Sequence, residues 1–176
     1  MFLDIRTINP VAYGPSDIFF LDTNVILYLH HPPSTASDPG KAGMYSNFIA
    51  QLRRAGCSLR ISSFNIQEAF HVVETIALKD FNKKNSPPDI SRKDFRKRFR
   101  SSVSVTQASL WTQFKNNYSI EDAIANQAML ESFINRYTHH FYDPIDYLFT
   151  TNHPTCSIIT SDRDFSSDPT LTVYSY

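Results

Sequence analysis

The sequence predicts an α/β protein with a doubly wound, mostly parallel sheet, and three observations support this fold class. Ile18–Leu21 is an unbroken apolar run, which is typical of a strand buried on both faces. Segments with helical periodicity lie between such runs, as expected where helices cover a parallel sheet. The chain has 176 residues, enough for one domain with a full core.

The first half of the chain is expected to alternate between strands and helices. In order, the predicted elements are a strand at 18–21, a short helix at 25–29, a helix at 44–55, a strand at 58–61 and a long helix at about 64–78. Pro32 stops the first helix, Gly56 ends the second, and Ser62 or Ser63 caps the third.

The second half continues with mostly helical segments and two closing strands. The predicted elements are helices at 91–115, at 119 to about 137 and at 143–151, followed by strands at 157–160 and 171–174. The helix at 119 is predicted because Asp122 follows Ser119 by three residues. No repeat or linker interrupts the chain, so residues 1–176 are expected to form a single domain.

Composition excludes several classes of protein. A hydrophobic content of 41% with 14% aromatic residues indicates a folded chain. No apolar run approaches 18 residues, so no membrane span is expected. Two cysteines make no disulfide framework, which favours a reduced, cytoplasmic location. Four glycines leave no glycine-rich phosphate loop.

Charge is unevenly distributed although the formal net charge is zero. Residues 79–100 contain nine basic and three acidic side chains, a balance of +6, so the remainder carries −6. A concentrated basic segment beside an acidic body is typical of polyanion binding next to an acidic site. A solvated helix face is the alternative interpretation of such a run.

Acidic side chains follow two of the predicted strands directly. Asp22 ends the strand at 18–21 and Asp162 follows the strand at 157–160. Ligands of doubly wound sheets bind beyond the carboxyl ends of the strands, so both acids are expected at one edge. For Asp22 alone, an ordinary helix N-cap is an equally good interpretation. Asn24 is expected to hold the Asp22 carboxylate, contact a metal-bound water or join the cap.

Further acids are candidates for the same edge. Glu68 lies early in the helix that follows the second strand, whereas Glu74, deeper in that helix, is expected to meet solvent or a basic neighbour. Pro144 fits the first helical position, which makes Asp143 the N-cap and leaves the Asp146 carboxylate available. Asp146 is therefore the preferred ligand and Asp143 the alternative.

Several carboxylates at one edge repel each other, and a divalent cation with oxygen ligands removes that conflict. Mg²⁺ and Mn²⁺ both suit such a set, and Asp164, beside Asp162, is expected either to support the ligands from behind or to bind a second, weaker metal. The cluster predicts metal-dependent hydrolysis of a phosphodiester. An aspartyl-phosphate phosphatase is disfavoured because the position two residues after Asp22 is Asn24.

Four segments, FFLDTNVILYL, ISSFNIQEAF, DPIDYLF and IITSDRDF, resemble the PIN-domain ribonucleases, and the resemblance spans about residues 18–165. It implies a PIN-like three-layer α/β/α sandwich, Mg²⁺ or Mn²⁺ dependence and cleavage of RNA. It also implies that Asp22, Glu68, Asp146 and Asp162 are the acids of the site. Stand-alone members are often toxins and commonly dimerise, so an antitoxin partner and a homodimer are expectations.

Two departures from the family pattern matter. Asp143 fits the family spacing of the third acid about as well as Asp146, and a basic helical insertion is expected at about 79–118. The insertion is interpreted as an arm that grips RNA, through Lys93, Arg96, Lys97, Arg98 and Arg100. The alternative functions are a metal-dependent DNA nuclease and a catalytically silent RNA-binding or scaffolding module.

Overall fold

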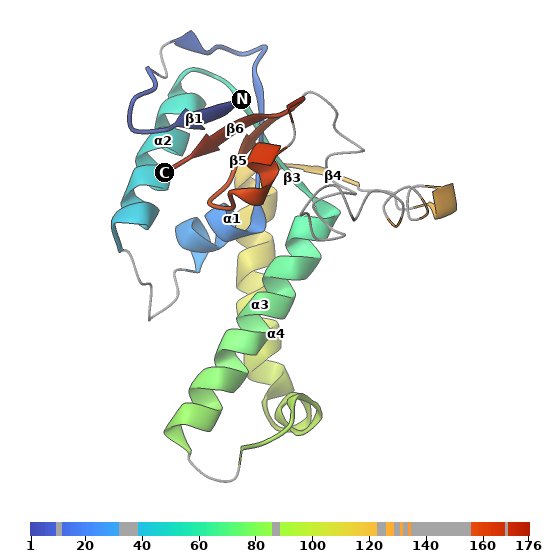
Figure 1. Ribbon diagram of the computed structural model, residues 1–176. Coiled ribbons are helices and arrows are strands. Elements are labelled where there is room, and N and C mark those ends of the chain that lie inside the picture. The colour runs from blue at the N-terminus through green and yellow to red at the C-terminus, as the bar shows by residue number, and fades with distance from the viewer. Residues whose placement is uncertain are drawn as a thin grey trace.

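A six-stranded sheet forms the centre of the protein (Figure 1). The computed structural model describes residues 1–9, 12–31, 39–85, 89–122, 126–128, 131, 134, 156–167 and 169–176. In these residues the strands are β1 (Phe2–Asp4), β2 (Ile18–Leu21), β3 (Ser58–Ser62), β4 (Ser119–Glu121), β5 (Ser157–Ile159) and β6 (Thr172–Ser175). Their order is β1-β6-β5-β2-β3-β4 and each pairing is parallel. The predicted α/β class is confirmed, and the described sheet is parallel throughout.

Helices connect the strands as the sequence pattern predicts. The described elements are α1 (Thr23–His30), α2 (Pro39–Arg54), α3 (Ser63–Lys84), α4 (Arg92–Asn117) and the 3₁₀ helix η2 (Asp164–Ser167). Ser62 caps α3 in a capping box with Asn65, which decides between the two predicted caps. Gly56 follows α2 with a φ of 80°, a conformation that favours glycine.

Both faces of the sheet are buried, which explains the unbroken apolar run of β2. Phe19 and Leu21 belong to the larger core cluster, to which α1, α2, α3 and α4 all contribute. Phe20 points the other way and packs with Ile158, Val173 and Phe165 of η2. Alternate residues of one strand thus enter two different clusters, as the two-residue period of a strand requires.

Three sequence-based expectations need correction. Ser119 opens the strand β4 rather than a helix, because its neighbour Tyr118 is extended and Ile120 pairs with Ile61 of β3. Strand pairing at this sheet edge outweighs the local capping signature. The N-terminal strand β1 was not expected, and α3 runs six residues beyond Leu78. The helix expected at 143–151 and most of 123–137 lie outside the described residues.

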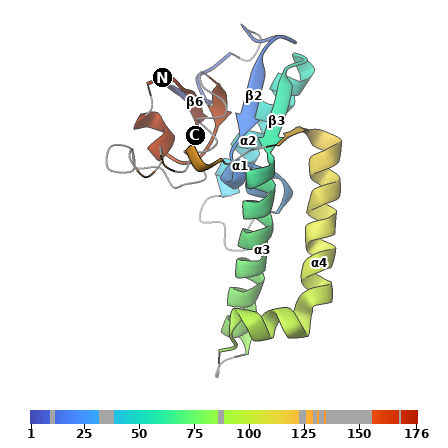
Figure 2. The same cartoon turned by 90° about the vertical axis from the view of Figure 1, so that its right-hand side faces the viewer.

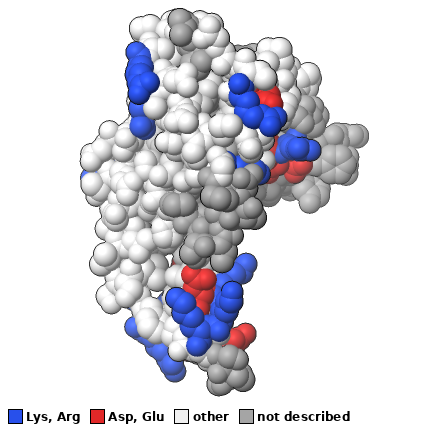
Figure 3. All heavy atoms as spheres, turned by 90° about the vertical axis from the view of Figure 1, so that its left-hand side faces the viewer, with Lys and Arg blue, Asp and Glu red and all other residues white. Residues whose placement is uncertain are grey.

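A long helical hairpin extends away from the sheet (Figures 1 and 2). It consists of α3 and α4, and α4 bends at Phe99, whose φ of −120° and ψ of 16° are not helical. Phe81, Phe95 and Phe99 pack against one another at its far end, with ring centroids 4.8 to 5.9 Å apart. Lys and Arg side chains gather at this end, with acidic side chains among them (Figure 3). In the described part of the chain, no helix is long and apolar enough to cross a membrane.

Candidate active site

Asp22 lies at the edge of the sheet where β2 ends and α1 begins. Its backbone N–H donates to the carbonyl of Ile159, 3.0 Å away, so the ends of the neighbouring strands β2 and β5 are joined at this point. Its carboxylate Oδ1 accepts from the N–H of Thr23 at 2.6 Å, which caps α1. Only 6% of the residue is exposed. Asp22 is therefore an N-cap, and its second oxygen remains for other partners.

Thr160 connects Asp22 to the residues that follow β5. Its hydroxyl donates to Oδ2 of Asp22 at 2.7 Å and accepts from the backbone N–H of Asp162 at 2.8 Å. The backbone carbonyl of Thr160 accepts from the hydroxyl of Tyr45 at 2.9 Å, which fixes this turn against α2. Thr160 is completely buried. The strand-end placement predicted for Asp22 and Asp162 is confirmed, and one hydroxyl links the two positions.

Glu68 approaches the same edge from the second turn of α3. Its Oε2 accepts from the hydroxyl of Thr23 at 2.5 Å, and Nδ2 of Asn65 donates to that hydroxyl at 3.1 Å. Asn65 is held in turn by its capping contacts with Ser62. Glu68 is half-buried. Thr23 and Asn65, in the first turns of α1 and α3, therefore hold Glu68 near Asp22 through neutral hydrogen-bonding groups.

The electrostatics of this edge disfavour a bare carboxylate. The pKa of Asp22 is raised to about 6, mainly by burial. The negative charges of Glu68 and Asp162 contribute to the rise, while the hydrogen bonds from Thr160 and the Thr23 N–H oppose it. Within the described residues, the hydrogen bonds to Asp22 come from a backbone N–H, a hydroxyl and the side-chain amide of Asn24, 3.3 Å away. None of these groups carries a charge.

Of the remaining candidate acids, Asp164 lies within the described residues and the other two do not. Asp164 is exposed, begins η2 and donates its N–H to Oδ1 of Asp162 at 2.9 Å. It therefore lies on the outer side of the turn that carries Asp162. Asp143 and Asp146 lie outside the described residues.

The chemistry of the donor set fits a hard divalent cation. Asp22, Glu68 and Asp162 offer only oxygen ligands, which Mg²⁺ and Mn²⁺ prefer, and a cation would offset the repulsion that raises the pKa of Asp22. In the described residues, no group of three or more His, Cys, Asp and Glu side chains is arranged to hold a metal ion. Asp22, Glu68 and Asp162 thus lie at the same sheet edge, but their side chains are not arranged as a metal-binding group.

The five basic residues expected to bind nucleic acid all lie in the first part of α4. Arg96 donates to both carboxylate oxygens of Glu74, at 2.7 and 3.0 Å, so Glu74 has the basic neighbour that was expected for it. Lys93, Lys97, Arg98 and Arg100 belong to the bent end of the hairpin. Lys97 and Arg100 line a hollow beside Arg96.

Thr23 and Asn65 belong to this site although sequence reasoning assigned them no role. Both are buried, and both act through hydrogen bonds that span more than 40 residues of sequence. The one local signal was their position: Thr23 directly follows the strand-end acid, and Asn65 lies three residues before Glu68. The residue types alone are equally typical of helix starts.

No protein-family model and no curated protein sequence matches the chain. Among solved structures, a similar one is the crystal structure of VapBC2 from Rickettsia felis bound to a DNA fragment from their promoter. The TM-score is 0.52 at 16% sequence identity, and the match covers 89% of this chain and 96% of that chain. A likeness at this identity concerns the fold. The chain has a PIN-like α/β/α fold with a central parallel sheet.

Proposed function

We propose that this protein is a divalent-metal-dependent endoribonuclease that hydrolyses RNA phosphodiester bonds at the edge formed by β2 and β5. The observation that carries the proposal is that Asp22, Glu68 and Asp162 lie at one sheet edge among neutral hydrogen-bonding groups, close enough for the other two acids to raise the pKa of Asp22. Burying a carboxylate beside two others is unfavourable, and proteins keep such clusters mainly at functional sites. The acidic motifs that resemble PIN-domain ribonucleases support the same reaction.

The acids and the residues that hydrogen-bond to them each have a definable part in this reaction. Asp22, Glu68 and Asp162 would hold Mg²⁺ or Mn²⁺. The family pattern has four acids, and its third in chain order would be Asp143 or Asp146. Asp164 would assist beside Asp162. When bound, the cation stabilises charge that develops on a phosphoryl oxygen and makes an attacking water more acidic. Thr160 and Thr23 fix the orientation of two of the carboxylates through their hydroxyls.

Asn24 is assigned to positioning as well. It is exposed, and its side-chain amide reaches Oδ2 of Asp22 at 3.3 Å, near the long limit of a hydrogen bond. Oδ2 already accepts from Thr160, so Asn24 restricts this oxygen from the solvent side. Its replacement by Ala is expected to weaken activity less than replacement of Asp22.

Cleavage of a labelled single-stranded RNA tests the proposal. The wild-type protein is assayed with Mn²⁺, with Mg²⁺ and with EDTA, beside Asp22→Asn, Asp162→Asn and the matched control Asp89→Asn. Asp89 is exposed and lies three residues before α4, away from the sheet edge, so its replacement removes the same charge elsewhere. Activity should require metal and Asp22, and the control should cleave like wild type.

The same assay separates the alternatives. Cleavage that survives both EDTA and Asp22→Asn refutes a metal nuclease. A labelled single-stranded DNA of the same sequence identifies a DNA nuclease if it is cut in preference to RNA. RNA binding without cleavage under any metal identifies the silent binding module.

We infer further that a protein partner regulates this activity. The similar VapBC2 structure is bound to a DNA fragment from their promoter. Stand-alone PIN-domain ribonucleases, which this sequence resembles, are often toxins. Expression of the active protein should then stop growth of a bacterial host, and Asp22→Asn should abolish that effect. Co-expression of a small protein encoded next to this chain should restore growth if it is the antitoxin.

A further inference from the structure

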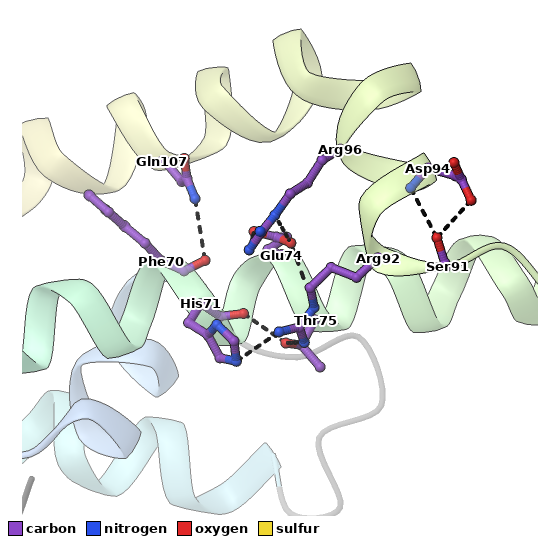
Figure 4. A network of polar contacts seen from close by, with 9 residues as sticks. All are labelled: Phe70, His71, Glu74, Thr75, Ser91, Arg92, Asp94, Arg96 and Gln107. Carbon is purple, nitrogen blue, oxygen red and sulfur yellow. Dashed lines mark hydrogen bonds and ion pairs between the residues drawn. The ribbon is translucent and has the colours of Figure 1, made fainter.

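A hollow of about 720 Å³ lies between α3 and α4, beside the bend of α4. Figure 2 shows the part of α4 before the bend turning across the end of α3. Two contacts between the helices border the hollow, and both are drawn in Figure 4: Gln107 donates to the carbonyl of Phe70 at 3.4 Å, and Arg96 pairs with Glu74. A volume of this size is in the range of ligand-binding pockets.

The charges around the hollow favour an anion. Arg96, Lys97 and Arg100 line it against a single acid, Glu74, which is 6% exposed and held by both oxygens. Glu74 therefore balances the charge of Arg96 and fixes the position of its guanidinium group. Among the described residues, no acidic side chain forms an ion pair with Lys97 or Arg100. Two positive charges in this wall remain available to a ligand.

The hollow lies farther along α3 than the candidate active site, toward the bent end of the hairpin. Glu68 and Glu74 are six residues apart in this helix, a rise of about 9 Å. Arg92 covers the interval, because it contacts Nε2 of His71 at 3.2 Å and donates to the hydroxyl of Thr75 at 2.7 Å (Figure 4). These two residues follow Glu68 by three and seven positions, so they share its face of the helix. Positive charge thus continues from the face of Glu68 to the hollow.

We propose that this hollow binds phosphates of the RNA strand at nucleotides away from the bond to be cut, with Lys97 and Arg100 as their ligands. The inference rests on the proposed function, which supplies RNA as the substrate. A strand held at the acids carries a phosphate every few ångströms, roughly 3.4 Å per nucleotide in a duplex, so nucleotides beyond the bond to be cut bring phosphates to positions farther along α3. Guanidinium and ammonium groups are the usual protein ligands of phosphate.

Binding of a fluorescein-labelled 20-nucleotide single-stranded RNA in EDTA tests this site without cleavage. The variant Lys97→Ser/Arg100→Ser removes the two available charges. The control Lys79→Ser/Lys83→Ser removes two exposed charges from the α3 side of the same hairpin, at positions that do not line the hollow. Fluorescence anisotropy is measured over 50 to 200 mM salt, roughly the range in which phosphate contacts dominate affinity.

The pocket variant should lose at least about tenfold in affinity at low salt, and its salt slope should fall by about 1.4, because each phosphate contact on a single strand contributes about 0.7. The control should change by less than about threefold, and Lys97→Arg/Arg100→Lys should bind like wild type because charge is kept. Equal losses in both Ser variants, or no loss in either, overturn the proposal. So does displacement of the RNA by oligoglutamate of equal charge as effectively as by unlabelled RNA.

The outcome is separable from that of the proposed function. Loss of binding in the pocket variant, combined with no cleavage by wild type under any metal, supports the phosphate site and refutes the nuclease. Cleavage by wild type, combined with unchanged binding by the pocket variant, supports the nuclease and refutes the phosphate site.

Discussion

Replacing Asp22 with Asn should stabilise the metal-free protein at neutral pH. Asp22 is buried, and its pKa is raised from 3.8 to about 6 by burial and by the charges of Glu68 and Asp162. A raised folded-state pKa means that the stability contribution is complete when the acid is protonated and is lost as the pH rises through the folded value. Asn at this position is neutral at every pH and keeps an oxygen for the N–H of Thr23.

The magnitude follows from the two pKa values. A difference of roughly two pH units between 3.8 and about 6 corresponds to about 3 kcal/mol between the extremes of pH. Between pH 5 and pH 8 the protonated form disappears from the folded protein, and linkage gives a loss of about 1.4 kcal/mol in the wild type. The free energy of unfolding of Asp22→Asn, relative to wild type, should therefore rise by that amount over the same interval.

Urea unfolding in EDTA, followed by circular dichroism at pH 5, 6, 7 and 8, measures this difference. Asp89→Asn provides the control, because this exposed acid should give a flat difference. Repeating the measurement at pH 8 with saturating Mg²⁺ should reverse the order if the proposed cation site exists, since a ligand that binds only the folded state stabilises it by mass action. Wild type should gain stability from Mg²⁺ and Asp22→Asn should gain much less.

The reasoning is refuted if Asp22→Asn is less stable than wild type at pH 8 in EDTA and the difference does not vary with pH. That outcome would mean that the capping and Thr160 contacts outweigh the cost of the charge. Asp22 would then be a structural N-cap, and the argument for a cation at this edge would lose its electrostatic basis.

Three further predictions concern other parts of the molecule. Thr160→Val should lower the free energy of unfolding by about 1–3 kcal/mol, because it removes the hydroxyl that donates to Oδ2 of the buried Asp22 and accepts from the N–H of Asp162. Thr160→Ser should retain most of the stability and the cleavage rate. Phe95→Ala should lower the free energy of unfolding by about 3–5 kcal/mol, because Phe95 is 4% exposed in the aromatic cluster of the hairpin. Calorimetry should show that Mg²⁺ binding at the sheet edge is unchanged. Loss of Mg²⁺ binding would show that the hairpin and the site are coupled. Burial lowers the pKa of His30 from 6.5, so stability should fall as the pH drops below about 6.5. In thermal unfolding measured over a series of pH values, His30→Gln should reduce that fall. An unchanged series would exclude His30 as the source of the pH dependence.

The interior of the fold was predictable from the sequence because its signals are local. The apolar run of β2 is long enough to show burial on both faces, and it coincides with the observed strand Ile18–Leu21. The N-caps of α1 and α3 are Asp22 and Ser62, residues that directly precede these helices and whose types favour this position. For the same reason Asp22 and Asp162 could be assigned to one edge, since parallel strands end together.

The edges of the sheet were not predictable in the same way. β1 and β4 have three residues each, and half-exposed strands of that length carry no distinctive periodicity. Their conformation depends on partners far away in sequence: Leu3 pairs with Tyr174, and Ile120 pairs with Ile61. The contact of Thr23 with Glu68 is similarly non-local, so the sequence indicated the acids but not the hydroxyl that separates them.

Glu74 and Asp22 show two different treatments of a buried acid within one chain. Glu74 is paired with Arg96 and lies 3.7 Å from Arg92, so the protein's own cations balance its charge. Asp22 is equally buried, yet its described hydrogen-bond donors are neutral and its charged neighbours are the acids Glu68 and Asp162. A structural acid is stabilised by the first arrangement. The second keeps a carboxylate oriented without neutralising it, which favours binding of a cation supplied from outside the chain.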